Sequence, residues 1–209
     1  LAQSGVYTLL VEARYNRGDV GSYGFVVNKV VDSSAAMALD QTVAATIAKG
    51  QTHSYSFSLS SDARATFDSL SRDISGADSY YLRWALTGPR GTLVSDRPFR
   101  SSDSSDGVSI LDLVAGDYTL SITSTNDVAG DYAFRLMDLA QATVFAAGDR
   151  IDGVFDPANE TDLFAFDAVA GQAYYFDVIA RSGGDARWTL LDPFGRAVFQ
   201  QRDFNSINA

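Results

Sequence analysis

The stretch RWALTGPRGTLV, residues 83–94, recurs in the same chain as RWTLLDPFGRAV, residues 187–198. The two copies lie 104 positions apart and share Arg, Trp, Leu, Pro, Gly and Val at matching places. A long match at a fixed offset within one chain indicates tandem copies of one folding unit. We therefore interpret each segment by its place in the repeat.

Four shorter matches accompany the long one, in the same order along the chain. Their offsets vary between 105 and 111 residues, as insertions and deletions in loops produce. Together they predict the tail of one repeat in residues 1–31, a complete repeat in 32–140 and the front of a third repeat in 141–209. The matches are GVYTL from Gly5 with GDYTL from Gly116; Gly21, Tyr23 and Phe25 with Gly130, Tyr132 and Phe134; Phe57, Phe67 and Asp68 with Phe166, Phe176 and Asp177; and Arg97 and Phe99 with Arg202 and Phe204.

Alternation of apolar and polar residues marks the strands within a repeat. Tyr55, Phe57 and Leu59 alternate with serines, which predicts a strand with one buried and one wet face. Such runs, separated by Gly and Pro, give roughly eight short strands between Val43 and Leu136. The other alternating runs are Tyr118, Leu120 and Ile122; Tyr132, Phe134 and Leu136; Phe164, Phe166 and Ala168; and Tyr174, Phe176 and Val178.

These patterns predict an all-β protein made of tandem, jelly-roll-like antiparallel β-sandwich repeats of about 105–110 residues. With 46% hydrophobic and 20% charged residues, the chain has enough apolar side chains for packed cores. Trp84 and Trp188 fall on equivalent strands, and we expect each to anchor the core of its copy.

The run GVFDPANETDLFAFDAVAGQAYYFDV at 153–178 is followed by LLDPFGRAV at 190–198, and the middle copy adds LVAGDYTLSI and AGDYAFRL. These motifs resemble the bacterial pre-peptidase C-terminal domain, repeat by repeat along the chain. The resemblance implies a β-sandwich appended to secreted proteases and other exported proteins, with tandem relatives in large surface proteins. The middle copy departs from it, with AKGQTHSYSF where the third copy has ANETDLFAF.

The composition excludes several classes of function. The net charge of −10, from 16 Lys and Arg against 26 Asp and Glu, repels phosphate backbones, so we expect no nucleic-acid partner. No run of about 18 apolar residues occurs, so we expect no membrane insertion. The absence of cysteine removes disulfides, zinc–thiolate sites and thiol nucleophiles. We expect an extracellular or cell-surface location.

No enzyme signature is present in the sequence. His53 is the single histidine, and we interpret it as an exposed polar residue at the start of a strand, because its counterpart in the third copy is Asp162. Neither G-x-S-x-G nor H-E-x-x-H occurs. We therefore expect that the chain is not an enzyme.

Calcium is the one ligand that the sequence suggests, and we expect no other cofactor. Calcium prefers several oxygen ligands, and the segment DPANETD supplies them in Asp156, Asn159, Glu160 and Asp162. A weaker candidate contains Asp103 and Asp106. The alternative is that these residues form Asx turns and solubilise their loops.

Exposed aromatic residues could form a platform for sugar binding. If the segment is extended, Tyr80 and Tyr81 point to opposite sides, and one of them is exposed. Packing in the core or at its rim is the favoured interpretation of this pair.

The leading functional hypothesis is a non-catalytic extracellular repeat module of a bacterial surface or secreted protein, acting in structure, adhesion or assembly. The alternative is a carbohydrate- or protein-binding accessory domain of a secreted hydrolase. The expected partners are neighbouring repeats, copies of the chain itself, or an extracellular protein or glycan. The unfinished third copy has three explanations: excision from a longer array, completion by the N-terminal strands of the same chain, or head-to-tail completion by a neighbouring subunit.

Overall fold

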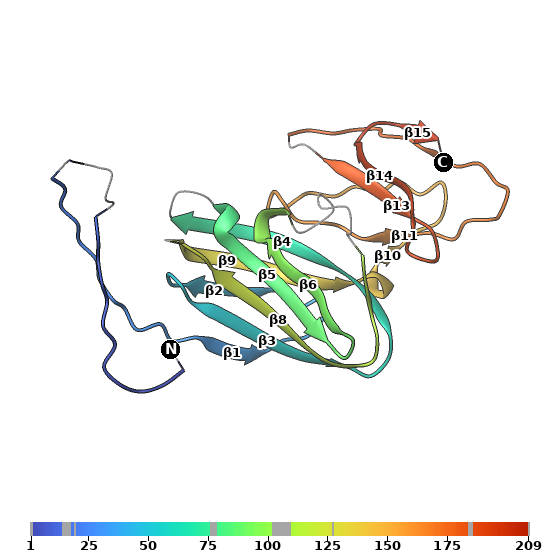
Figure 1. Ribbon diagram of the computed structural model, residues 1–209. Coiled ribbons are helices and arrows are strands. Elements are labelled where there is room, and N and C mark those ends of the chain that lie inside the picture. Colours follow the sequence, from blue (N-terminus) through green and yellow to red (C-terminus); the bar gives the residue numbers. More distant parts are fainter. Residues whose placement is uncertain are drawn as a thin grey trace.

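The structure is a computed structural model of the chain, and it describes residues 2–13, 18, 20–75, 79–101, 110–126, 128–183 and 186–208. Three parts follow one another along the chain (Figure 1). We call residues 2–31 the N-terminal segment, residues 33–138 the central sandwich and residues 143–208 the C-terminal unit.

Two sheets form the central sandwich. One has five strands in the order β1-β3-β8-β5-β6, and the other has four in the order β2-β9-β4-β7. Most consecutive strands lie in different sheets, whereas β5 and β6 form a hairpin within the five-stranded sheet. The fold is the all-β sandwich that the sequence predicts. The strands are β1 (Ser33–Ala36), β2 (Val43–Ile47), β3 (Thr52–Leu59), β4 (Ala63–Ser75), β5 (Leu82–Gly88), β6 (Gly91–Pro98), β7 (Leu111–Leu113), β8 (Gly116–Ser124) and β9 (Ala129–Asp138).

Strand β1 departs from the antiparallel pattern expected from the sequence. It lies at the edge of the five-stranded sheet and runs parallel to β3, with Ser33 opposite His53 and Ala36 opposite Ser56. Its sequence SSAA has no apolar alternation, and all four side chains are exposed. Backbone pairing at an edge needs no buried side chain, so this strand leaves no periodic signal in the sequence.

The core lies between the two sheets and is rich in aromatic rings. Phe67 of β4 stacks on Trp84 of β5, with ring centroids 4.1 Å apart, and on Phe134 of β9 at 5.2 Å. Trp84 is 1% exposed, which agrees with its expected role as a core anchor. Phe67 thus packs against a ring of its own sheet and a ring of the other sheet, and the contact with Trp84 links the two sheets.

Gly130 of β9 shows why one repeated glycine is needed. Its φ is +143°, and a Cβ at this position would overlap the backbone carbonyl of Asp73 on β4. Only glycine allows the two strands to approach this closely.

Short strands and a cluster of aromatic rings build the C-terminal unit. Trp188 contacts Phe176 at 5.7 Å and Phe204 at 4.8 Å between ring centroids. The three sheets each have two strands, and β10 with β11 repeats the parallel pairing of β1 with β3. The strands are β10 (Thr143–Val144), β11 (Phe164–Ala165), β12 (Tyr175–Phe176), β13 (Arg187–Leu191), β14 (Ala197–Asp203) and β15 (Ile207–Asn208).

The described residues of the N-terminal segment form no strand, and the segment extends to one side of the central sandwich before it joins β1 (Figure 1). The segment meets the sandwich at its end, where Gln51 donates to the carbonyl of Val31 at 2.6 Å and the backbone N–H of Thr52 donates to Asp32 at 2.8 Å. Among the residues that the structure describes, no helix is long and apolar enough to cross a membrane.

Candidate functional site

The outer face of the four-stranded sheet carries a buried carboxylate. Ala65 and Phe67 of β4 point into the core, whereas Thr66 and Asp68 lie on the opposite face. All four are nevertheless buried, and Asp68 is 0% exposed. A second layer must therefore cover this face of the sheet, and residues 159–162 of the C-terminal unit supply part of it.

Arg135 of β9 joins the two layers. It lies directly opposite Asp68 in the strand pair, and its Nε donates to Asp68 Oδ2 at 2.7 Å. Its second terminal nitrogen donates to the carbonyl of Thr161 at 2.8 Å and lies 3.8 Å from a carboxylate oxygen of Glu160. One guanidinium group thus binds a carboxylate below it and the backbone of the next unit above it.

The segment predicted to bind calcium is the one that docks here. Asn159 donates its side-chain amide to the carbonyl of Ser69 on β4. Glu160 accepts from the backbone N–H of Asp156 at 2.9 Å, which closes the loop on itself. Asn159 and Glu160 therefore make contacts within the protein, while Asp162 faces Arg135 and Glu160.

No group of three or more His, Cys, Asp or Glu side chains able to hold a metal ion occurs among the described residues. Calcium binding by Asp156, Asn159, Glu160 and Asp162 stays a prediction. The weaker candidate, with Asp103 and Asp106, lies outside the described residues.

Burial shifts the pKa values of two carboxylates at this junction. It raises the pKa of Asp68 above its ordinary value, and the hydrogen bond and charge of Arg135 offset part of that rise. The pKa of Asp162 is also raised, first by burial and then by repulsion from Glu160, with Arg135 acting in the opposite direction. Arg135 is thus the positive charge around which the carboxylates of both parts are arranged.

An open pocket of about 350 Å³ lies beside Arg135, between the central sandwich and the C-terminal unit. Its walls include Asp40 and Asp138 from the sandwich and Asp152 and Asp162 from the unit that follows. The pocket is acidic, and its openness gives little enclosure for a small organic ligand.

A second contact crosses the same junction at a distance from Arg135. Arg64, at the start of β4, donates to the carbonyl of Pro193 in the turn between β13 and β14 at 2.8 Å. It also pairs with Asp112 on β7 at 3.1 Å. Two arginines therefore hold the C-terminal unit on one face of the central sandwich.

His53 is buried, so the expectation of an exposed histidine was wrong. It shares the inward face of β3 with Tyr55 and Phe57 and is 5% exposed. Its Nδ1 lies 2.7 Å from the hydroxyl of Tyr132, which in turn is 2.6 Å from the hydroxyl of Tyr55. Burial lowers the pKa of His53, with an opposing effect from Asp32.

Tyr80 and Tyr81 do not form an extended pair. They lie in a short 3₁₀ turn, Ser79–Tyr81, with rings nearly perpendicular, and both are about 40% exposed. The guanidinium groups of Arg83 and Arg100 lie 4.8 and 5.0 Å from the Tyr80 ring centroid. These contacts occupy ring surface that a sugar would need for stacking.

Sequence reasoning missed Arg135 and Asp68 as a pair, because the two residues are 67 positions apart and a charge on the outer face of a strand is usually solvated. One signal was available. Asp68 follows Phe67 in the middle copy as Asp177 follows Phe176 in the third, and a repeated charge beside a repeated core residue indicates a structural partner.

Comparison with known proteins finds solved structures that are similar to part of this chain. No protein-family model matches the sequence, and no curated protein matches it. The pre-peptidase C-terminal domain of collagenase from Bacillus anthracis is 13% identical with a TM-score of 0.35, and the match covers 52% of this chain and 97% of that domain. The two sheets of the central sandwich are themselves the evidence for a β-sandwich, the fold that the sequence resemblance implies.

PliG of Aeromonas hydrophila, a periplasmic inhibitor of g-type lysozyme, is 10% identical with a TM-score of 0.32. The match covers 52% of this chain and 100% of that protein. At these identities the similarity concerns the fold alone.

Proposed function

We propose that the chain is a non-catalytic repeat module of a secreted or surface-exposed bacterial protein, in which each sandwich is docked on the next in a fixed orientation. The contacts of Arg135 with Asp68 and Thr161 carry this proposal. A flexible linker would keep neighbouring units independent, whereas a partly buried, charge-assisted contact fixes their spacing. A fixed spacing between units suits a module that displays or assembles other parts of a protein.

The internal contacts of the two tryptophan hairpins support the repeat interpretation. Trp84 packs on Phe67, and Trp188 contacts Phe176, which is the sequence match of Phe67. In both hairpins an arginine at the start pairs with an aspartate on the returning strand, at positions of that strand that do not match in sequence. These ion pairs are Arg83 with Asp96 at 3.1 Å and Arg187 with Asp203 at 3.8 Å.

The environment of His53 supports a role without catalysis. The single imidazole of the sequence is 5% exposed on the inward face of β3, where it contacts the hydroxyl of Tyr132. Burial lowers the pKa of His53, which disfavours the charged form of the imidazole. A general base must instead reach the reacting atoms.

Small-angle X-ray scattering of the 209-residue chain tests the fixed spacing. The variant Arg135→Ala with Asn159→Ala removes two contacts across the junction, and we expect a larger maximum dimension and a scattering profile of increased flexibility. The control is Arg150→Ala, because Arg150 pairs with Asp152 inside the C-terminal unit and lies on the surface. Identical profiles for wild type, double variant and control would reject the proposal.

A further inference from the structure

Arginine and tyrosine side chains gather at the open end of the hairpin formed by β5 and β6. A 3₁₀ turn precedes β5, a second 3₁₀ turn follows β6, and the two turns contact each other. Residues from both sides of the hairpin therefore meet at this place. We call the group the arginine cluster, and its members are Tyr80, Tyr81, Arg83, Asp96 and Arg100.

Two guanidinium groups lie against the ring of Tyr80. The Cζ atom of Arg83 is 4.8 Å from the ring centroid, and that of Arg100 is 5.0 Å from it. Each cation is attracted to the ring. The two charges also lie within about one Debye length of each other, which is about 10 Å at 0.1 M salt, so they repel. An anion placed between them would be attracted by both.

Asp96 shows which kind of anion the cluster accepts. Its two carboxylate oxygens accept hydrogen bonds from Nε and a terminal nitrogen of Arg83, each at 3.1 Å. The planar guanidinium group is suited to this bidentate contact with a carboxylate. The side chain of Asp96 is 72% exposed, so the contact lies at the surface, where a second carboxylate can compete for Arg83.

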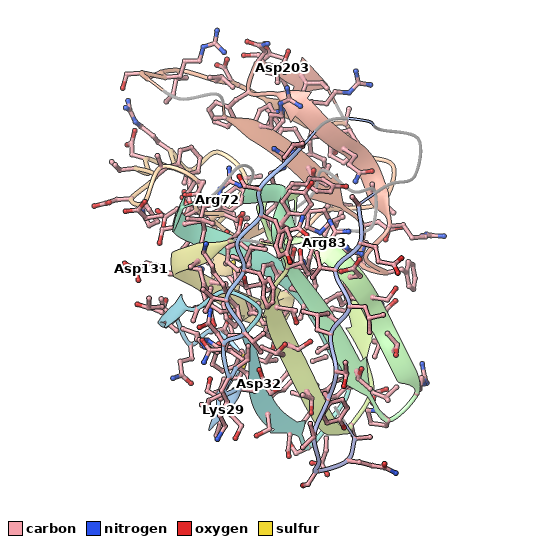
Figure 2. The ribbon with its side chains drawn as sticks, turned by 60° about the vertical axis from the view of Figure 1, so that its left-hand side comes forward. Lys29, Asp32, Arg72, Arg83, Asp131 and Asp203 are labelled. Atoms are coloured by element: carbon pink, nitrogen blue, oxygen red, sulfur yellow. The ribbon has the colours of Figure 1, made fainter. Side chains whose placement is uncertain are left out.

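The charge of the cluster differs in sign from that of the whole chain. The cluster contains two arginines and one aspartate, whereas the chain has a net charge of −10. Figure 2 shows Arg83 apart from the carboxylates of Asp32 and Asp131. Most of the surface therefore repels an anionic ligand, and the cluster attracts it.

The exposure of the cluster indicates how a ligand would be recognised. Tyr80 and Tyr81 are 40% and 38% exposed, and Arg100 is exposed. Because the guanidinium groups lie against the Tyr80 ring, recognition of a sugar depends on charge rather than on stacking. A polymer with a carboxylate on each unit fits this surface, since it contacts both arginines at once.

We propose that the arginine cluster binds an acidic polysaccharide through the carboxylates of its uronic acid units. One carboxylate pairs with Arg100, and a second competes with Asp96 for Arg83. The choice of a polysaccharide rests on the extracellular setting of the function proposed above.

Calorimetric titration of the 209-residue chain with alginate oligosaccharides tests this inference. We expect binding at low salt that weakens as NaCl is added, because salt screens exposed charges. Neutral dextran oligosaccharides of the same length should not bind. Arg100→Gln should weaken alginate binding about threefold, which is the effect of losing one exposed ion pair.

Arg90→Gln is the matched control, because it removes the same charge from the same hairpin. Arg90 is exposed in the turn between β5 and β6, and the length of β5 separates it from Arg83 by about 20 Å. Its substitution should change alginate binding less than that of Arg100.

Asp96→Asn should have the opposite effect to Arg100→Gln. It removes the carboxylate that competes for Arg83, so we expect alginate to bind about threefold more tightly. Asn tolerates the left-handed backbone of Asp96, whose φ is +51°, so the fold is kept. A loss in one variant and a gain in the other cannot both come from unfolding, and thermal melting checks that each variant is folded.

Three results would overturn the inference: no binding of alginate at low salt, an equal loss in Arg100→Gln and Arg90→Gln, or no gain in Asp96→Asn. Equal binding of a DNA oligonucleotide with the same number of charges would show attraction of any polyanion, and would reject the assignment to a polysaccharide. The scattering test of the junction separates these failures from failure of the proposed function. A loose junction in wild type rejects the repeat module, whereas an intact junction without alginate binding rejects this inference alone.

Discussion

The Nε of Arg135 donates to Oδ2 of Asp68 at 2.7 Å, and the two residues lie directly opposite each other on β9 and β4. Asp68 is fully buried, and 22% of the Arg135 side chain is exposed. The same guanidinium group reaches Thr161 of the C-terminal unit. The pair therefore couples the stability of the sandwich to the docking of the next unit.

Arg135→Ala should destabilise the central sandwich by about 3 kcal/mol, because it leaves the buried Asp68 carboxylate without its positively charged partner. Urea denaturation followed by fluorescence measures this loss. Adding Asp68→Asn to the variant should recover part of it, since the amide carries no charge to desolvate. Arg150→Ala, on the surface, should cause no measurable change. Equal effects of Arg135→Ala and Arg150→Ala would contradict this account of the pair.

His53 should make the protein less stable as the pH falls below about 6.5. The folded state lowers the pKa of His53, so the unfolded chain binds the proton more tightly, and acidification favours unfolding. The raised pKa values of Asp68 and Asp162 act in the opposite direction. The difference between wild type and His53→Gln therefore isolates the histidine. We expect this difference to change between pH 7 and pH 5, and a constant difference would refute the prediction.

The two tryptophans should report two unfolding transitions. Trp84 is 1% exposed within two complete sheets, whereas Trp188 lies in a half-buried cluster with short strands. Single-tryptophan variants, Trp84→Phe and Trp188→Phe, separate the two signals. The signal from Trp188 should change at lower urea than the signal from Trp84 in dilute protein. Coincident transitions would mean that the two parts unfold as one unit.

Gly130→Ala should cost more than about 1 kcal/mol, because a Cβ there overlaps the carbonyl of Asp73. Gly21 is its sequence match, and a Cβ at Gly21 meets nothing within 4 Å. Gly21→Ala should therefore leave the unfolding midpoint unchanged in dilute protein. Thermal melting of the two variants measures both effects.

The calcium prediction has its own test. If Asp156 and Asp162 hold a calcium ion, millimolar CaCl₂ raises the melting temperature of the wild-type chain, and Asp156→Asn with Asp162→Asn removes the rise. Magnesium should have a smaller effect, because it demands a stricter geometry. If the melting temperature does not rise, the calcium prediction is wrong, and Arg135 is the positive charge that this loop contacts.

The strands of the central sandwich could be predicted from sequence where burial imposes alternation. Tyr55, Phe57, Tyr118 and Leu120 all lie on buried faces, as the period of two indicates. Trp84 could be assigned to the core because a large ring between two sheets has few other places to go.

Other features leave no local signal. Strand β1 pairs through its backbone alone, so the sequence SSAA does not reveal it. His53 occupies an inward position in the alternation of β3, but a polar side chain is usually expected at the surface. Inside the sandwich, the hydroxyl of Tyr132 is the hydrogen-bond partner of its imidazole. The partners Arg135 and Asp68 meet only after β4 and β9 have paired, and sequence spacing does not encode that contact.

The distance between the central sandwich and the C-terminal unit tests the central claim most directly. Spin labels at Ser58→Cys and Val198→Cys, in chains diluted with unlabelled protein, report this distance within one chain by double electron–electron resonance. The account predicts one narrow distance distribution in wild type that broadens in Arg135→Ala. A broad distribution in wild type, unchanged by Arg135→Ala, would contradict it.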